Sequence, residues 1–131
     1  MKVVQASPVR VPVSDIDRAL ATYRDCLGFS VTQDVGSGPS RSVTLISRGQ
    51  VMSILLLGGS PDEPVGSLRE AVLPVSDLAA ILGCLRWAGL TEHWVDTDAP
   101  GGPAALFADH DGNVWTLWQP QAADGRESAA A

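Results

Sequence analysis

The feature of this sequence that most constrains its fold is an internal repeat. Three segments recur in the same order: residues 11–16 (VPVSDI) as 73–78 (LPVSDL), 27–29 (LGF) as 88–90 (AGL), and 49–55 (GQVMSIL) as 112–118 (GNVWTLW). The offsets are 62, 61 and 63 residues, and so small a drift over three segments indicates one structural unit written twice. We therefore expect two copies of one unit that fold together into a single small domain.

Both copies have the same local pattern, which predicts a β-α-β-β-β unit. After an apolar strand, a Ser-Asp pair (14–15 and 76–77) can accept hydrogen bonds from the first turn of a helix. Apolar residues at helical spacing predict helices over 16–27 and 78–88, each followed by a glycine. The strands are predicted at 9–13, 30–34, 42–47 and 51–57, and at 71–75, 93–96, 104–108 and 114–119. This pattern predicts an α+β fold of two tandem βαβββ modules.

The length and composition of the chain fit one domain. With 131 residues, 45% of them hydrophobic, the chain can bury one core but is too short for two independent domains. We expect a single domain over residues 1–120, with modules at about 3–57 and 66–120. A Gly/Pro-rich linker is predicted at 58–65 and a flexible tail at 121–131.

Charge and hydropathy argue against several classes of partner. The net charge is −6 and the chain has a single lysine, whereas binding of nucleic acid requires clustered Lys and Arg. The longest apolar run, residues 51–57, is much shorter than the roughly 18 residues that a membrane span requires. The first residues lack the basic region and the long apolar stretch of a signal peptide. We expect a cytoplasmic protein that binds neither nucleic acid nor a membrane.

Two motifs, in this order within a duplicated frame, resemble those of the vicinal oxygen chelate superfamily of glyoxalases, bleomycin resistance proteins and extradiol dioxygenases. The first is residues 13–15 (VSD) leading to 23–29 (YRDCLGF), and the second is residues 107–113 (FADHDGN). The resemblance covers about residues 9–120. It implies two curved mixed sheets that form a cup, usually from paired chains, and hence a homodimer. Because this fold hosts many activities, the resemblance does not select one of them.

In metal-dependent members of that superfamily, four side chains on the floor of the cup, usually His, Glu or Gln, hold the metal. The family pattern and the repeat place these positions at Pro8, Ser53, Glu70 and Thr116. Proline has no side-chain ligand, neutral hydroxyls are poor ligands for transition metals, and one carboxylate is not enough. The two histidines, His93 and His110, match none of these positions. We therefore expect no metal and no other cofactor.

Glu70 is the one candidate for acid–base catalysis at a cup-facing position, since a buried carboxylate in an apolar cup can act as a base. Alternatively, Glu70 pairs with Arg10 or Arg69, or hydrogen-bonds a ligand. No Ser/His/Asp or Cys/His arrangement supplies a second catalytic group. We favour a protein without enzymatic activity. The main alternative is an enzyme of this fold, a lyase, isomerase or dioxygenase, with an unusual site that uses Glu70.

Four tryptophans beside two phenylalanines and one tyrosine are an unusual balance. Strand alternation puts Thr116 and Trp118 on one face of the last strand and Trp115 on the other. If Thr116 faces the cup, Trp118 does too, and its indole offers a flat surface on which a planar ligand can stack. Trp94 could face either way. Trp87, at the end of the second helix, is expected in the core.

The first strand adds a cation to this candidate site. Pro8 and Arg10 share a face, and Arg10 would bring hydrogen-bond donors to an otherwise apolar floor. The candidate ligand-binding residues are Pro8, Arg10, Ser53, Leu55, Glu70, Trp94, Thr116 and Trp118. We expect a metal-independent protein that sequesters an aromatic or bulky natural product, in antibiotic self-resistance, and that resembles the metal-free antibiotic-binding resistance branch of the superfamily. A third hypothesis is a ligand carrier in a biosynthetic pathway.

Overall fold

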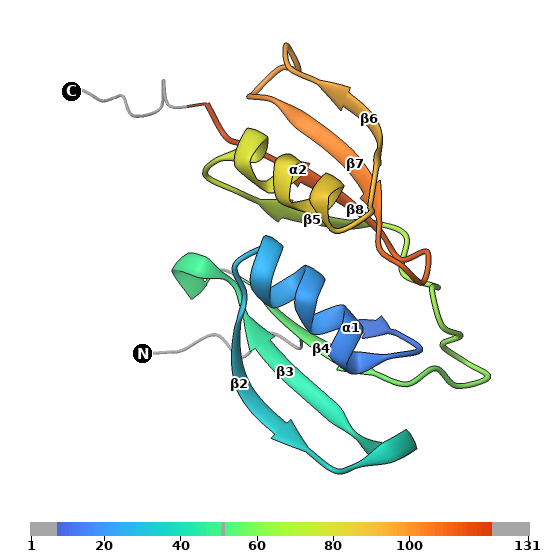
Figure 1. Cartoon of the computed structure of the whole chain (residues 1–131). Coiled ribbons are helices and arrows are strands. Elements are labelled where there is room, and N and C mark those ends of the chain that lie inside the picture. Colours follow the sequence, from blue (N-terminus) through green and yellow to red (C-terminus); the bar gives the residue numbers. More distant parts are fainter. Residues whose placement is uncertain (1–7, 51, 122–131) are drawn as a thin grey trace. The chain divides into compact units, whose positions relative to one another are not determined.

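The computed structural model describes residues 8–50 and 52–121, which form two compact units (Figure 1). The first unit holds the N-terminal module as far as Leu68 together with the segment Asp109–Asn113, and the second holds the other residues from Arg69 onward. The α+β fold of two tandem βαβββ modules is confirmed. The packing of the modules into a single domain stays a prediction, and the expected tail, apart from residue 121, lies outside the described residues.

The first unit contains a four-stranded mixed sheet in the order β1-β4-β3-β2. Its strands are β1 (Val9–Pro12), β2 (Ser30–Val35), β3 (Ser42–Ile46) and β4 (Ser53–Leu57). β1 and β4 are parallel, whereas β4, β3 and β2 are successively antiparallel. Figure 1 shows α1 (Ile16–Leu20) lying over one face of this sheet, and the helix continues as a π-helical segment, η1 (Ala21–Cys26). Two short 3-10 turns, η2 (Gly38–Ser40) and η3 (Arg48–Gln50), flank β3.

The second unit repeats this topology in the strand order β5-β8-β7-β6. Its strands are β5 (Ala71–Pro74), β6 (Glu92–Asp96), β7 (Ala104–Ala108) and β8 (Val114–Trp118). β5 is parallel to β8, and the other neighbouring strands are antiparallel. Its helix is α2 (Leu78–Trp87). Every predicted strand is present, with ends within two residues of the predicted ones. The described residues contain no helix that is long and apolar enough to cross a membrane.

Both helices begin and end where the repeat predicts. Asp15 and Asp77 are the N-caps, and the side chain of each accepts a 3.1 Å hydrogen bond from the backbone N–H three residues later. Gly28 and Gly89 follow the helices with φ values of +83° and +91°, in the left-handed region that glycine adopts without a Cβ clash. The first predicted helix, 16–27, differs only in changing from α-helical to π-helical bonding after Leu20.

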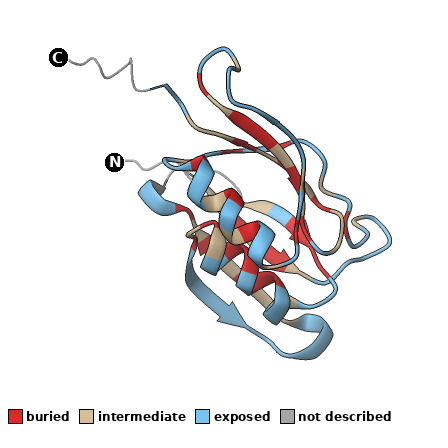
Figure 2. Cartoon of the chain, turned by 45° about the horizontal axis from the view of Figure 1, so that its top comes forward, coloured by how far each residue is buried: buried red, intermediate tan, exposed pale blue. Residues whose placement is uncertain are grey.

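Each sheet is buried on the face that its helix covers, and Figure 2 shows how buried and less buried residues alternate along the inner strands. In the first unit the buried strand residues of this face are Val11, Val43, Leu45, Ile54 and Leu56. In the second unit they are Ala71, Leu73, Ala105, Phe107, Trp115 and Leu117. Because strand side chains alternate, every second residue points to the opposite side of its sheet, which no helix of the described residues of its unit covers.

Trp87 departs from the predicted core, because its side chain is 91% exposed. The buried residues of α2 are Leu78, Leu82 and Leu85, which are four and three residues apart and therefore form one stripe. Trp87 lies two residues beyond Leu85, about 200° around a helix of roughly 100° per residue, and so points away from the sheet. The prediction that Trp87 fills the core is wrong.

The turn between β7 and β8 is hydrogen-bonded into the first unit. The buried Asp109 carboxylate accepts hydrogen bonds from Tyr23 Oη at 2.7 Å and from Asn113 Nδ2 at 2.9 Å. The backbone N–H groups of Asp111 and Asn113 also donate to Asp109, both at 2.9 Å. Asn113 Nδ2 in turn donates to the Pro12 carbonyl at 2.9 Å. A segment of the second copy therefore completes the structure of the first unit.

Candidate ligand-binding faces

The helix-free side of the first sheet, named face 1 here, brings together the four candidate residues of the first copy. Arg10 pairs with Leu55 across the parallel strands β1 and β4. Pro8 and Ser53 each lie two residues earlier along the chain, so they lie on the same face as Arg10 and Leu55. The other members of face 1 are neutral: Pro12, Ser30, Gln33, Val35, Ser42, Thr44, Ile46 and Leu57. Arg10 is therefore the only charged side chain that the four described strands present on face 1.

Arg10 is paired with a residue that sequence analysis did not consider. Its Nε donates a 2.7 Å hydrogen bond to Glu63 Oε1, and the two side chains are 50% and 37% exposed. A tight turn holds Glu63 in place, because its backbone carbonyl accepts from Ser60 N at 2.9 Å and its N–H donates to Ser60 O at 3.1 Å. The acidic partner of Arg10 therefore comes from the linker between the modules.

The helix-free side of the second sheet, named face 2, carries the aromatic candidates. Val72, Thr116, Leu106 and Trp94 lie side by side across the four strands, in that order. Val72 and Trp94 lie on the two edge strands, β5 and β6, and are 48% and 44% exposed, so both present apolar surface on this face. The register settles the orientation that the sequence left open, because Trp94 pairs with Leu106 and so shares the face of Thr116.

Trp118 and Trp115 take opposite sides of β8, as alternation predicts. Trp118 lies on face 2 between Pro74 and Ala104, whereas Trp115 is fully buried on the helix side. The indole Nε1 of Trp118 donates a 3.2 Å hydrogen bond to the carbonyl of Gly101 in the loop after β6. This bond satisfies the polar edge of the ring, so its flat apolar surface is held in one orientation.

The strand registers correct one equivalence that was drawn from the repeat. Leu55 lies beside Arg10, and Thr116 lies beside Val72, which is the repeat mate of Arg10. Thr116 therefore corresponds to Leu55 and not to Ser53. The cause is the connection before the last strand, which is one residue longer between β3 and β4 than between β7 and β8. Aligning Gly49 with Gly112 misses this difference and shifts the mate of Thr116 by two residues, from Leu55 to Ser53.

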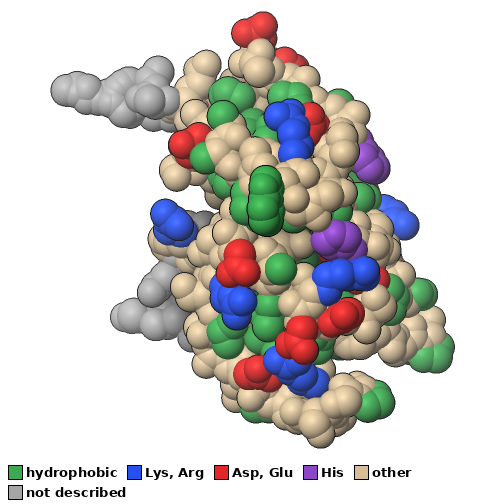
Figure 3. All heavy atoms as spheres, in the orientation of Figure 1, with side chains coloured by type: hydrophobic (Ala, Val, Ile, Leu, Met, Phe, Trp, Pro, Cys, Tyr) green, Lys and Arg blue, Asp and Glu red, His purple; other side chains and the backbone are tan. Residues whose placement is uncertain are grey.

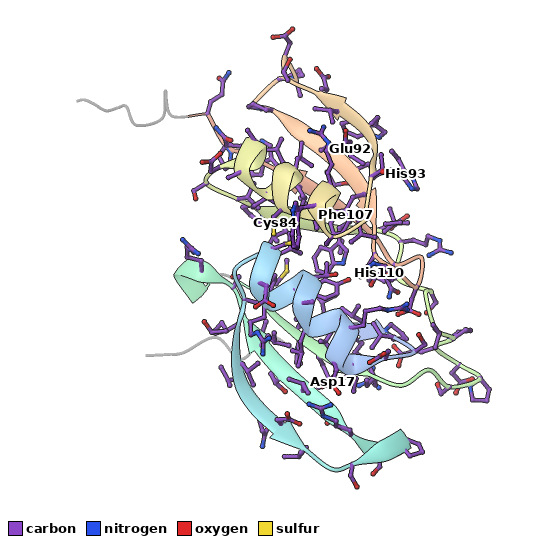
Figure 4. All side chains as sticks on the ribbon, in the orientation of Figure 1. Asp17, Cys84, Glu92, His93, Phe107 and His110 are labelled. Atoms are coloured by element: carbon purple, nitrogen blue, oxygen red, sulfur yellow. The ribbon has the colours of Figure 1, made fainter. Side chains whose placement is uncertain are left out.

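The residues at the family's four metal positions do not fit a metal. With the corrected register these positions are Pro8, Leu55, Glu70 and Thr116, which together offer one carboxylate and one hydroxyl. Within residues 8–50 and 52–121, no group of three or more His, Cys, Asp and Glu side chains could hold an ion. Figure 4 labels His93 on β6 and His110 in the β7–β8 turn, and both are exposed. We therefore assign no metal-dependent step to either face.

Glu70 differs from its expected environment. It directly precedes β5 and is exposed, so the apolar burial that would favour its use as a base is not observed. Its position two residues before Val72 places it at the margin of face 2. This position suits a contact at the rim of a bound ligand better than proton transfer in a dry pocket.

Two other charge pairs involve the edge strands β2 and β6. Arg41 donates two hydrogen bonds to Asp34, at 2.9 and 3.0 Å, and thereby lowers the pKa of the Asp34 carboxyl. Arg86 Nε donates to Glu92 Oε1 at 3.0 Å, and the Arg86 hydrogen bonds lower the pKa of the Glu92 carboxyl. Figure 3 shows acidic and basic side chains intermixed on the visible surface, with no extended basic patch.

Comparison with known proteins gives the family. The model of the Glyoxalase/Bleomycin resistance protein/Dioxygenase superfamily matches residues 5–117. The chain belongs to this superfamily. No curated protein matches the chain.

Solved structures of the superfamily include proteins of the antibiotic-binding kind. TnmS3, an antibiotic binding protein from Streptomyces sp. CB03234, is 31% identical with a TM-score of 0.77, over 92% of this chain and 99% of TnmS3. A glyoxalase/bleomycin resistance protein from the same organism is 32% identical with a TM-score of 0.74, over 86% of this chain and 100% of that one. The fosfomycin resistance protein FosX from Listeria monocytogenes is 13% identical with a TM-score of 0.69, over 92% and 96% of the two chains, which shows the fold alone.

Sequence reasoning missed three residues of these faces. Val72 and Leu106 are the neighbours of Thr116 on face 2, and alternation along β5 and β7 carried the signal for both. Glu63 had no local signal, because its role depends on how the linker folds back toward Arg10.

Proposed function

We propose that this protein binds an aromatic or bulky natural product and sequesters it without chemistry, as an antibiotic self-resistance protein. The observation that carries the proposal is face 2, where two indoles and two aliphatic side chains surround one hydroxyl, that of Thr116. Stacking on each indole contributes about 0.5–1.5 kcal/mol beyond the burial of apolar area. A face of this composition suits a planar ligand with few charges.

Face 1 supplies polar contacts in this proposal. Arg10 and Ser53 offer hydrogen-bond donors, while Pro8 and Leu55 offer apolar contact, on a surface that is otherwise neutral. Glu70 and Thr116 complete the proposed ligand-binding set with Trp94 and Trp118. The likeness to TnmS3, which is described as antibiotic binding, supports a ligand of the antibiotic class. The proposal includes a cytoplasmic homodimer that needs no metal or other cofactor.

Native mass spectrometry against a panel of aromatic natural products tests the binding. We expect a stoichiometric complex that resists chelators and releases the compound unchanged. Stoichiometric Fe, Zn, Ni or Mn by elemental analysis would contradict the metal-independent mode. Conversion of the compound, abolished by Glu70→Gln, would instead establish the enzyme of the main alternative hypothesis.

Resistance is tested separately from binding. Expression of the chain in a sensitive bacterium is expected to raise the inhibitory concentration of the bound compound in proportion to the amount of protein. A compound that binds tightly but leaves the inhibitory concentration unchanged would favour a pathway carrier over sequestration.

A further inference from the structure

The Arg10–Glu63 pair leaves most of the Arg10 guanidinium available. An arginine side chain has five N–H donors, and Glu63 accepts only from the single N–H at Nε. Within the described residues, no protein group accepts a hydrogen bond from the two terminal nitrogens of Arg10. Four donors in a planar fork are therefore presented beside Leu55 on face 1.

In the same pair, the Glu63 carboxylate offsets the positive charge of the Arg10 guanidinium. The 2.7 Å contact puts a full negative charge against the guanidinium, and no other charged side chain of the described strands lies on face 1. A ligand carboxylate on the terminal nitrogens would share one positive charge with the Glu63 carboxylate. A neutral carbonyl oxygen would receive the same hydrogen bonds without this repulsion.

The position of Glu63 is fixed before any ligand arrives. Two backbone hydrogen bonds join Ser60 and Glu63, and the Glu63 N–H also donates a 3.1 Å hydrogen bond to Ser60 Oγ. A Cβ at Gly59 would collide with the backbone nitrogen of Val65, so the chain on either side of Glu63 is closely packed. The backbone of Glu63 is therefore held within reach of Arg10, and the 2.7 Å contact places the carboxylate against the guanidinium.

From these contacts we infer that Glu63 is a specificity-determining residue. By neutralising Arg10 and leaving its fork open, Glu63 makes face 1 select aromatic ligands with neutral carbonyl groups, such as ketones, esters and amides, over aromatic carboxylates. The inference rests on the proposed function, because it requires that face 1 contacts the sequestered ligand. The net charge of −6 acts in the same direction.

Two probes with one ring system test the selection: 2-naphthamide and 2-naphthoate, titrated calorimetrically at neutral pH. The wild-type protein is expected to bind 2-naphthamide more tightly. Glu63→Gln is expected to raise the affinity for 2-naphthoate about tenfold, as removal of one nearby charge predicts, with little change for 2-naphthamide. The gain is expected to shrink as salt is added.

Matched variants separate this effect from a general change in charge. Asp34→Asn also removes one carboxylate from an exposed arginine pair of the same unit, but Asp34 pairs with Val43 on the helix side of the sheet. Asp34→Asn is therefore expected to leave both affinities unchanged. Adding Arg10→Met to Glu63→Gln is expected to abolish the gain for 2-naphthoate.

The outcomes distinguish this inference from the proposed function. If Glu63→Gln shifts both affinities equally, or neither, while binding persists, the role of Glu63 is refuted and sequestration stands. The same holds if the wild type prefers 2-naphthoate. If neither probe binds the wild type or Glu63→Gln, aromatic binding and the selection by Glu63 both fail.

Discussion

The helix-free faces of the two modules differ far more than their topologies do. Both modules pair a first strand in parallel with the last, and both bury an apolar row under the helix. Face 1, however, has one cation among hydroxyl and aliphatic groups, whereas face 2 has two indoles. Where Arg10 lies on face 1, its repeat mate on face 2 is Val72. The duplication has kept the side that forms the core and has let the other side diverge.

The connections before the last strands differ as well. In the first copy this connection contains η3, with Gly49 at φ +82°. In the second copy it contains Asp109 and Asn113, whose side chains hydrogen-bond to Tyr23 and Pro12 in the first unit. The second of these connections therefore holds another segment of the chain in place, through side chains that have no counterpart among the described residues of the first connection.

The largest expected effect comes from a substitution of Asp109, in the connection between β7 and β8. Asp109→Ala removes a buried carboxylate that accepts four hydrogen bonds, from Tyr23, Asp111 and Asn113. We expect a loss of about 3 kcal/mol in the free energy of unfolding, measured by urea denaturation.

Tyr23→Phe is the graded control, because it removes one donor and keeps the ring that packs edge-on against Phe29. It is expected to cost about 1 kcal/mol. A loss at Asp109→Ala no larger than that of Tyr23→Phe would show that the turn does not hold the first unit together.

The next expected effects compare the loss of binding affinity for one substitution on each face. Trp118→Ala is expected to weaken the binding of 2-naphthamide about tenfold, since it removes an oriented stacking surface from face 2. Ser53→Ala on face 1 removes one hydroxyl and is expected to cost about threefold at most. Calorimetry measures both without relying on tryptophan emission.

Trp87→Ala is the matched control for this experiment. It deletes the same side chain from the outer side of α2, where Trp87 contacts little of the chain. Binding and the free energy of unfolding are both expected to stay within about 0.5 kcal/mol of wild type. Equal losses for Trp87→Ala and Trp118→Ala would refute the placement of the ligand on face 2.

Local patterns predicted the fold because each of them determines its own segment. The Asp15 and Asp77 caps, the glycines after the helices and the alternation around Thr116 all act over a few residues. The family likeness supplied the pairing of the strands. Trp87 was misplaced although its helix carried the answer, because the leucine stripe of α2 already excluded it from the core.

The sequence predicted which face of each sheet carries the candidate residues. It did not predict the strand register or the partner of Arg10. Leu55, and not Ser53, is the mate of Thr116, because the β3–β4 connection has one residue more than the β7–β8 connection. A comparison of the two copies without gaps cannot locate that extra residue. The Arg10–Glu63 contact spans 53 positions and depends on the path of the linker. Contacts of this kind follow from the folded chain, and no periodicity in the sequence encodes them.

The smallest expected effect compares one partly exposed ion pair from each copy, Asp34–Arg41 and Glu92–Arg86. Hydrogen bonds from the arginine lower the pKa of Asp34 and of Glu92 below the ordinary carboxyl range. Between the native and unfolded pKa values the unfolded state binds more protons, so each pair stabilises the fold above the unfolded pKa. This contribution is lost as the pH falls through the native pKa.

Thermal unfolding from about pH 6 down to about pH 3 measures this contribution. Asp34→Asn and Glu92→Gln are each expected to flatten the acid limb of the melting curve slightly relative to wild type, because the variant has no carboxyl to protonate there. Both effects are expected to weaken at high salt, since one partner of each pair is exposed to solvent. Asp62→Asn is the reference variant, because it removes one exposed carboxylate from the linker, between β4 and β5. An acid limb equally flattened by Asp62→Asn would attribute the effect to net charge, and the two pairs would then not contribute to either sheet edge.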